Sequence, residues 1–261
     1  MLPIIEGVIA RRVLLNFRVD ADVARKLVPE PLELHLKKGW AMAGVCLIRL
    51  EQLRPRGLPA FTGLSSENMA HRIAVRYPCD GGMKDGVYIL RRETDQAFVS
   101  LLGGHLFPGV HHRAQFDVID GHRLVGVDVR TRDHKADVTF AGLESEQWQA
   151  TPAFATFGEA SEFFRRGCCG FSLGSDGRTL EGMRLETRKW EMKRLRVTEL
   201  YAGFFEDNPD FPRGSVRFDN ALLMRNIPHE WHEVKLADPA REAEEAAEAE
   251  LLAAAPAWPG M

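Results

Sequence analysis

The sequence has few cysteines, no strong charge excess and no long apolar run, and each absence excludes a class of protein. Its four cysteines form no C-x-x-C motif and are too few for a disulfide framework, which suits a reducing compartment. A formal net charge of −3 argues against a basic surface for nucleic acid or anionic lipid. No run reaches the ~18 apolar residues of a membrane helix, and the first residues lack a signal-peptide layout. We therefore expect a cytoplasmic protein that binds neither nucleic acid nor membranes.

Motifs for nucleotides and activated nucleophiles are also missing. The chain contains no G-x-S-x-G elbow, phosphate-binding loop or dinucleotide fingerprint. The arginine pairs at 91–92 and 165–166 lack a glycine-rich loop or interleaved aromatic residues, so we interpret them as solvated charges. These absences predict no bound cofactor.

What is present is a succession of strand-like segments. Asp120-Gly121 and Asp176-Gly177 stand between such segments and predict two hairpins. Strands at this spacing, joined by short helices, indicate a mainly-β barrel or sandwich. The expected strands cover 12–18, 32–37, 40–53, 68–77, 86–93, 97–102, 113–119 and 122–130.

Helices are expected at few places. The apolar spacing within 21–28 predicts a short helix, and Thr156 with Glu159 forms a capping box for another over 157–166. The Ala- and Glu-rich end of the chain favours a helix but has no large apolar stripe. We therefore expect one β domain over 1–235 and an acidic helical tail over 236–261.

The segment SSENMAHRIAVRY carries ionisable residues within a strand pattern. On a period of two, Glu67 and His71 share a face with the apolar Met69 and Ile73. Buried ionisable groups are costly unless they are paired, which makes these two candidates for chemistry. The alternative is a loop glutamate and a satisfied core histidine. The opposite face, which includes Arg72, has the character of a solvated face.

The segment HLFPGVHHRAQF places two adjacent histidines at the start of a strand. His111 and His112 could act in catalysis, bind a metal or simply begin the strand. Because consecutive strand residues point to opposite faces, at most one of them should face an interior. This divergence favours a site without metal.

The segment RRVLLNFRVDADVARKLVPEPLEL resembles the N-terminal region of the acetoacetate decarboxylase family, and GGHLFP resembles the segment that precedes its active-site lysines. The later FFRRGCCGFSLGSDGRTLEGMRLETRKW is similar to a branch of that superfamily defined only as a domain of unknown function. The resemblance covers about residues 10–230. It implies a cone-like β-barrel with flanking helices, an internal pocket and a homo-oligomeric state.

The resemblance also implies roles for particular residues. Glu67 matches the pocket glutamate of the family, and Arg11 or Arg12 matches the arginine that holds the substrate carboxylate. Phe107 and Pro108 match the aromatic-proline step before the reactive lysines.

The reactive lysines themselves are missing. Gly109 and Val110 occupy the corresponding positions, and no lysine occurs between Lys84 and Lys135. An imidazole cannot replace a lysine in forming a protonated imine, so the Schiff-base mechanism is not expected to transfer.

Together these observations predict a pocket for a small organic acid or carbonyl compound. The substrate would be bound by Arg11 or Arg12 together with Phe107, Pro108 and His112. Glu67 would act as acid or base, with His71 or His111 assisting proton transfer in a lyase, hydratase or isomerase step. The alternatives are a binding barrel without catalysis and a metal-dependent enzyme that uses His111 and His112.

Overall fold

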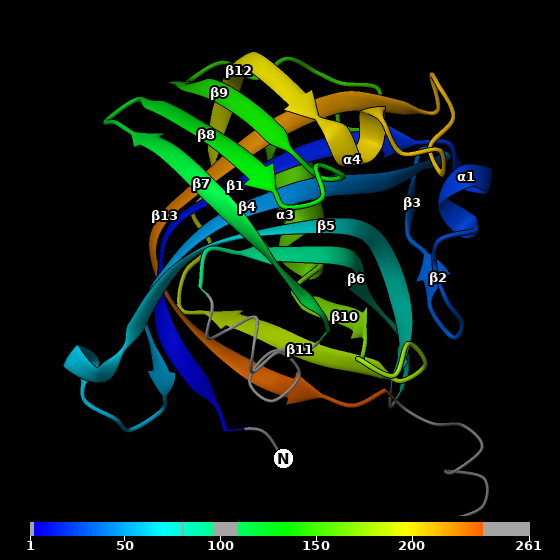
Figure 1. Ribbon diagram of the computed structural model, residues 1–261. Helices are drawn as coiled ribbons and strands as arrows, with labels where there is room; N and C mark the ends of the chain where they lie inside the picture. The colour runs from blue at the N-terminus through cyan, green and yellow to red at the C-terminus, as the bar shows by residue number, and fades with distance from the viewer. Residues whose placement is uncertain (1–2, 80, 97–108, 237–261) are drawn as a thin grey trace, which may run out of the picture.

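The computed structural model describes residues 3–79, 81–96 and 109–236, most of which belong to one strongly curved β-sheet (Figure 1). The strands are β1 (Ile5–Val19), β2 (Glu33–Leu34), β3 (Leu36–Lys37), β4 (Trp40–Pro55), β5 (Leu64–Cys79), β6 (Gly82–Thr94), β7 (His111–Asp120), β8 (Leu124–Thr131), β9 (Val138–Ser145), β10 (Cys169–Leu173), β11 (Leu180–Thr187), β12 (Lys193–Ala202) and β13 (Val216–Val234). The helices are α1 (Ala21–Arg25), α3 (Phe157–Arg166), α4 (Gly203–Glu206) and the 3-10 turn η1 (Ala60–Thr62). The predicted mainly-β class with short helices is confirmed. No helix in the described ranges is long and apolar enough to cross a bilayer.

The strand pairings close the sheet into two rings that share a wall. Strands β13, β1, β4, β5 and β6 are consecutive neighbours and form that wall. Strands β10 and β11 join β6 to β13 and complete a seven-stranded ring. Strands β7, β8, β9 and β12 make the second connection and complete a nine-stranded ring. In Figure 1 the nine-stranded ring lies above the shared wall and the seven-stranded ring below it.

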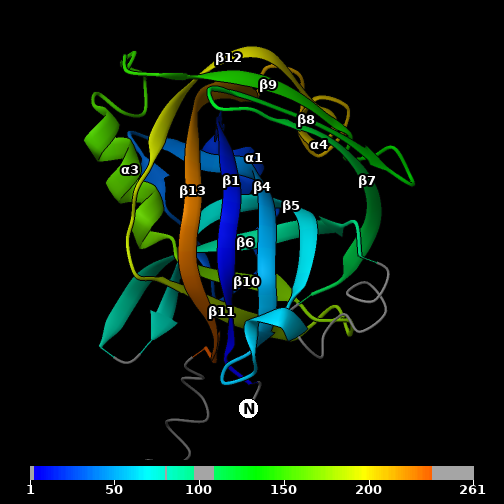
Figure 2. The ribbon, with the colours of Figure 1, turned by 90° about the vertical axis from the view of Figure 1, so that its left-hand side faces the viewer.

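The shared wall is buried on both faces, so alternate residues on each strand enter different interiors. On β1, Val13 and Leu15 pack with Val127 and Phe140 of the nine-stranded ring. The intervening Leu14 belongs to a second core cluster. That cluster includes Met42, Leu222 and the α3 side chains Phe163 and Phe164. Figure 2 shows α3 at the edge of the molecule on the side where β13 and the yellow β12 segment lie.

The local signals in the sequence are largely confirmed. Helix α3 spans the predicted 157–166, and the Thr156 side chain accepts a hydrogen bond from the Glu159 amide. Both hairpins form, but each turn is longer than the two-residue type: Asp120 pairs with Val125, and Leu173 pairs with Leu180. The predictions for 97–102 and for almost all of the 236–261 tail fall outside the described residues.

A β-bulge in β6 interrupts the alternation of side chains. His71 pairs with Arg91 and Arg72 pairs with Ile89, which leaves Leu90 without a partner on β5. Because a bulge adds one residue without a partner, the later residues of the strand are one position out of step with the alternation counted along the sequence. Arg92 therefore lies on the same face of the wall as Arg72.

Gly182 closes the seven-stranded ring at a point without room for a side chain. It pairs with Phe171 of β10 on one side and Val234 of β13 on the other. A Cβ at this position would lie 2.6 Å from the Phe171 ring and 2.7 Å from the Val234 carbonyl oxygen. The closure of the ring therefore depends on glycine here.

We predict that Gly182→Ala lowers the free energy of unfolding by roughly 1–3 kcal/mol, because overpacking displaces β10 or β13. Urea denaturation of the purified variant measures the loss. Gly126→Ala on β8 is the matched control, since its Cβ would meet no atom closer than 3.7 Å. Equal stability of the two variants would contradict the requirement for glycine at ring closure.

Candidate functional site

The seven-stranded ring encloses a cavity of about 120 Å³. Every strand of the ring contributes to its lining, with apolar side chains from Ile48, Leu50, Met183, Leu185 and Trp231. Polar groups are few, and the most prominent are three arginines on three different strands: Arg12, Arg72 and Arg92. A mostly apolar cavity with a few polar groups is the usual form of a small-molecule site.

The strand register places the three arginines around a floor of two small residues. Cys46 of β4 is paired with Ala70 of β5, and Ala70 is paired with Arg92 of β6. Arg12 and Arg72 are diagonal neighbours of Cys46, because they pair with Ile48 and Gly44. The Arg12 Nε donates a hydrogen bond to the Cys46 Sγ at 3.4 Å.

The arginines are held by neutral groups. The Arg72 Nη2 donates to the Asn16 Oδ1 at 2.8 Å, and its guanidinium stacks 5.1 Å from the centre of the Phe164 ring. Both Nε and Nη2 of Arg92 donate to the Ser172 Oγ, at 3.2 and 3.1 Å. Burial lowers the pKa of Arg72 and of Arg92 to about 10. Both remain charged at neutral pH.

Among the described residues, no carboxylate forms an ion pair with any of these three arginines. Glu181 is near enough to raise the pKa of Arg92 but lies beyond ion-pair distance. The carboxylate of Glu93, which also borders the cavity, is held by Arg91. Because buried charges are costly without partners, this arrangement favours a bound anion.

Of the adjacent histidines, His111 lines the cavity and His112 is exposed, as the strand alternation predicts. Burial, together with the nearby charge of Arg92, lowers the pKa of His111 to about 3. Its imidazole is therefore neutral over the physiological range. Cys168 also lines the cavity, and a hydrogen bond from Cys169 lowers its pKa to about 6.

Glu67 and His71 lie on the other face of β5, toward the nine-stranded ring. The Arg11 Nη2 forms a buried ion pair with the Glu67 Oε2 at 2.6 Å, and its Nη1 lies 3.3 Å from the Asp120 Oδ2. Burial raises the pKa of Glu67, and the charge of Arg11 opposes that rise. Of the two arginines matched to the family, Arg12 therefore lines the cavity and Arg11 does not.

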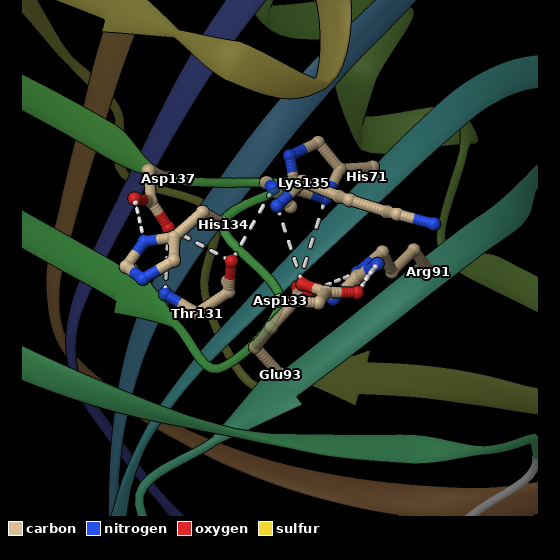
Figure 3. Close-up of polar contacts among 9 residues, drawn as sticks. His71, Arg91, Glu93, Thr131, Asp133, His134, Lys135 and Asp137 are labelled. Atoms are coloured by element: carbon tan, nitrogen blue, oxygen red, sulfur yellow. Dashed lines mark hydrogen bonds and ion pairs between the residues drawn. The ribbon is translucent and has the colours of Figure 1, made fainter.

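His71 belongs to a separate chain of polar contacts, shown in Figure 3. Its Nδ1 lies 3.6 Å from the Glu93 Oε2, and both side chains are fully buried. Glu93 in turn pairs with Arg91, and Arg91 pairs with Asp133 in the loop after β8 at 2.8 Å. The His71 ring also stacks 4.3 Å from that of Phe204. This chain ties the loop after β8 to the shared wall.

Two expectations from the sequence are wrong here. Arg72 does not lie on a solvated face, and Arg91 and Arg92 are not solvated charges: Arg72 is buried, Arg92 lines the cavity and Arg91 is ion-paired. The reason is the second ring, which covers a face that a one-sided strand would leave in water. The bulge at Leu90 adds a change of face that no sequence pattern marks.

Other expected site residues fall elsewhere. Phe107 and Pro108 lie outside the described residues. Within the described ranges, the three side chains close enough to share a metal ion are Glu186, Glu230 and His232, a group that does not include His111 or His112. The hypothesis of a metal bound by the adjacent histidines gains no support from this geometry.

The low pKa of His111 predicts acid sensitivity. The unfolded chain takes up a proton on this histidine near pH 6.5, whereas the folded protein does not until about pH 3. Because the unfolded state then binds more protons, stability is full above pH 6.5 and falls as the pH drops toward 3. Between pH 7.5 and 4.5 the free energy of unfolding, measured by urea denaturation, should fall by about 1–2 kcal/mol less in His111→Gln than in the wild type. His112→Gln should keep the wild-type pH dependence, and identical profiles for both variants would contradict the assignment.

Comparison with known structures identifies the fold. Acetoacetate decarboxylase from Legionella pneumophila is 12% identical to this chain and superposes on it with a TM-score of 0.60. The match covers 91% of this chain and 88% of the decarboxylase. An acetoacetate decarboxylase-like enzyme from Sphingomonas wittichii RW1 is 13% identical, with a TM-score of 0.56, and the match covers 90% of this chain and 94% of the enzyme. The enduracididine biosynthesis enzyme MppR, complexed with pyruvate, gives 12% identity, 90% coverage of both chains and a TM-score of 0.55. At such identities the likeness establishes the fold alone.

Sequence comparison identifies the family. A search of curated protein sequences gives no match. A family model described as an uncharacterized conserved protein, DUF2071, matches residues 9–215. This range includes most of the shared wall and the three arginines of the cavity. The chain belongs to the DUF2071 family and has the acetoacetate decarboxylase-like fold.

Proposed function

We propose that this protein binds a small organic acid with a carbonyl group inside the seven-stranded ring, and that it acts on this compound as a lyase, hydratase or isomerase. The observation that carries the proposal is a group of three guanidiniums in a mostly apolar cavity that form no ion pair with any carboxylate in the described part of the chain. A guanidinium matches the planar, bidentate geometry of a carboxylate. The proposal assigns the primary carboxylate contact to Arg12.

His111 has the properties needed to polarise a carbonyl group. Its neutral imidazole can donate an N–H to an oxygen on which negative charge develops, and a neutral histidine in an enclosed site is known to act in this way in other enzymes. The charge of the neighbouring Arg92 would stabilise the same developing charge. His111 is therefore assigned to the reacting carbonyl in place of Glu67 and His71, whose side chains point into the other ring.

The reaction is proposed to proceed without a lysine imine. None of the eight lysines lines the cavity, and all lie within the described residues. Seven of them are exposed, and the half-buried Lys37 forms an ion pair with Glu159 at 2.6 Å. A nucleophilic lysine at neutral pH needs burial or a close cation to lower its pKa. The positions of the lysines offer no such environment beside the cavity.

The first test is carboxylate binding. Pyruvate and acetoacetate are used as probes in isothermal titration calorimetry, and Arg12→Gln should weaken the binding of both by about 10-fold or more, because a charged hydrogen-bond donor is lost. Arg213→Gln removes an exposed arginine outside the cavity and is the matched control. Equal weakening by both variants would mean that the acid binds elsewhere.

The second test separates turnover from binding. Incubation of the protein with a bound keto acid in D₂O, followed by proton NMR, should show exchange of the hydrogens next to the carbonyl, at least ~10-fold slower in His111→Gln. Borohydride added to the same mixture should leave the intact mass unchanged. Binding without exchange would identify a ligand-binding barrel, and a lysine adduct would contradict the absence of an imine.

A further inference from the structure

The three arginines of the cavity enter it from three different strands. Arg12 lies on β1 and Arg92 on β6, and β4 and β5 lie between those strands. Three strand spacings of ~4.8 Å separate their backbones by about 14 Å. The Arg12 side chain reaches toward Cys46, and that of Arg92 toward Ser172 of β10. Arg72, on β5, reaches the floor beside Cys46. Cys46 and Ala70, which have small side chains, line the cavity on the two strands between those of Arg12 and Arg92.

The charge of this site is larger than one carboxylate can balance. A monocarboxylate held by Arg12 would leave Arg72 and Arg92 facing neutral partners, Asn16 and Ser172. Each desolvated guanidinium without an anion carries an electrostatic cost, and a second negative charge would relieve it. Glu93 does not supply that charge, because Arg91 and His71 surround its carboxylate. Glu181 raises the pKa of Arg92 but lies beyond ion-pair distance from it.

The cavity also limits the size of the compound. A cavity of about 150 Å³ is known to accommodate the six carbons of benzene, so one of about 120 Å³ restricts the compound to a short carbon chain. Since Arg12 and Arg92 enter from opposite sides, two separate carboxylates fit them better than one phosphate group, which gathers its charges at a single point.

We propose that the cavity selects a short dicarboxylate of about three to five carbons, with one carboxylate on Arg12 and the other on Arg92. Arg72 adds positive charge near the middle of the compound, beside Cys46. This inference rests on the proposed function and names the substrate class of the same site. A keto dicarboxylate would in addition present its carbonyl group to His111.

The test compares dicarboxylates with monocarboxylates of the same length. Malonate, succinate and glutarate are titrated against propionate, butyrate and valerate at constant ionic strength by isothermal titration calorimetry. We expect at least one dicarboxylate to bind about 10-fold more tightly than its monocarboxylate counterpart, because it forms a second charged pair. Inorganic phosphate, titrated alongside, tests for a site that binds a single dianionic group.

Variants of Arg92 locate the second carboxylate. Arg92→Gln should reduce the preference for the dicarboxylate to about 3-fold or less, because it weakens dicarboxylate binding more than monocarboxylate binding, and Arg92→Lys should give an intermediate preference. Arg213→Gln should keep the full preference, which controls for loss of net charge. Circular dichroism verifies folding. If Arg92→Gln does not fold, Arg12→Gln replaces it, with loss of both the preference and monocarboxylate affinity.

The possible outcomes separate this inference from the proposed function. Monocarboxylates that bind as tightly as dicarboxylates would overturn the inference and leave the proposed function intact. Absence of binding by both series and by the keto acids would overturn both. Phosphate as the tightest ligand, or an unchanged preference in Arg92→Gln, would overturn the two-carboxylate arrangement.

Discussion

The structure depends on one constraint: five neighbouring strands are buried on both faces. Each side chain of the shared wall points into one of two interiors, and the residue two positions further along the same strand points into the same interior. The alternation of Val13, Leu14 and Leu15 between the two core clusters shows this requirement on β1. A wall of this kind cannot give up one face to water, so charged residues on it must be matched inside the protein.

The two interiors balance charge in different ways. In the nine-stranded ring, Arg11 faces Glu67 and Asp120, and Arg91 faces Glu93 and Asp133, so cations and carboxylates are paired. In the seven-stranded ring, the arginines are supported by an amide, a hydroxyl and a thiol. Buried ion pairs within a protein hold elements in register, whereas cations solvated by neutral groups keep their charge available to a ligand. This difference is the basis for the proposed binding role of the seven-stranded ring.

The sequence was sufficient for features that depend on neighbouring residues. The capping box at Thr156, both Asp-Gly hairpins and the divergence of His111 from His112 follow from local stereochemistry. The roles of Glu67 and Arg72 could not be assigned in this way. A strand pattern of apolar and charged residues has the same appearance whether its charged face meets water or a second ring. Only the long-range pairing of β11 with β13 distinguishes these cases, and no local pattern encodes that pairing.

The extra residue Leu90 has a consequence for variation in the length of β6. Deleting it would restore regular alternation and keep the pairs on both sides of the bulge, because Ile89 already pairs with Arg72 and Arg91 with His71. Arg92 would still lie opposite Ala70 on the cavity face, and Glu93 on the other face. Loss of a residue from a regular stretch of the strand would instead turn every later side chain to the opposite face. A single-codon deletion is therefore conservative at the bulge and disruptive elsewhere in β6.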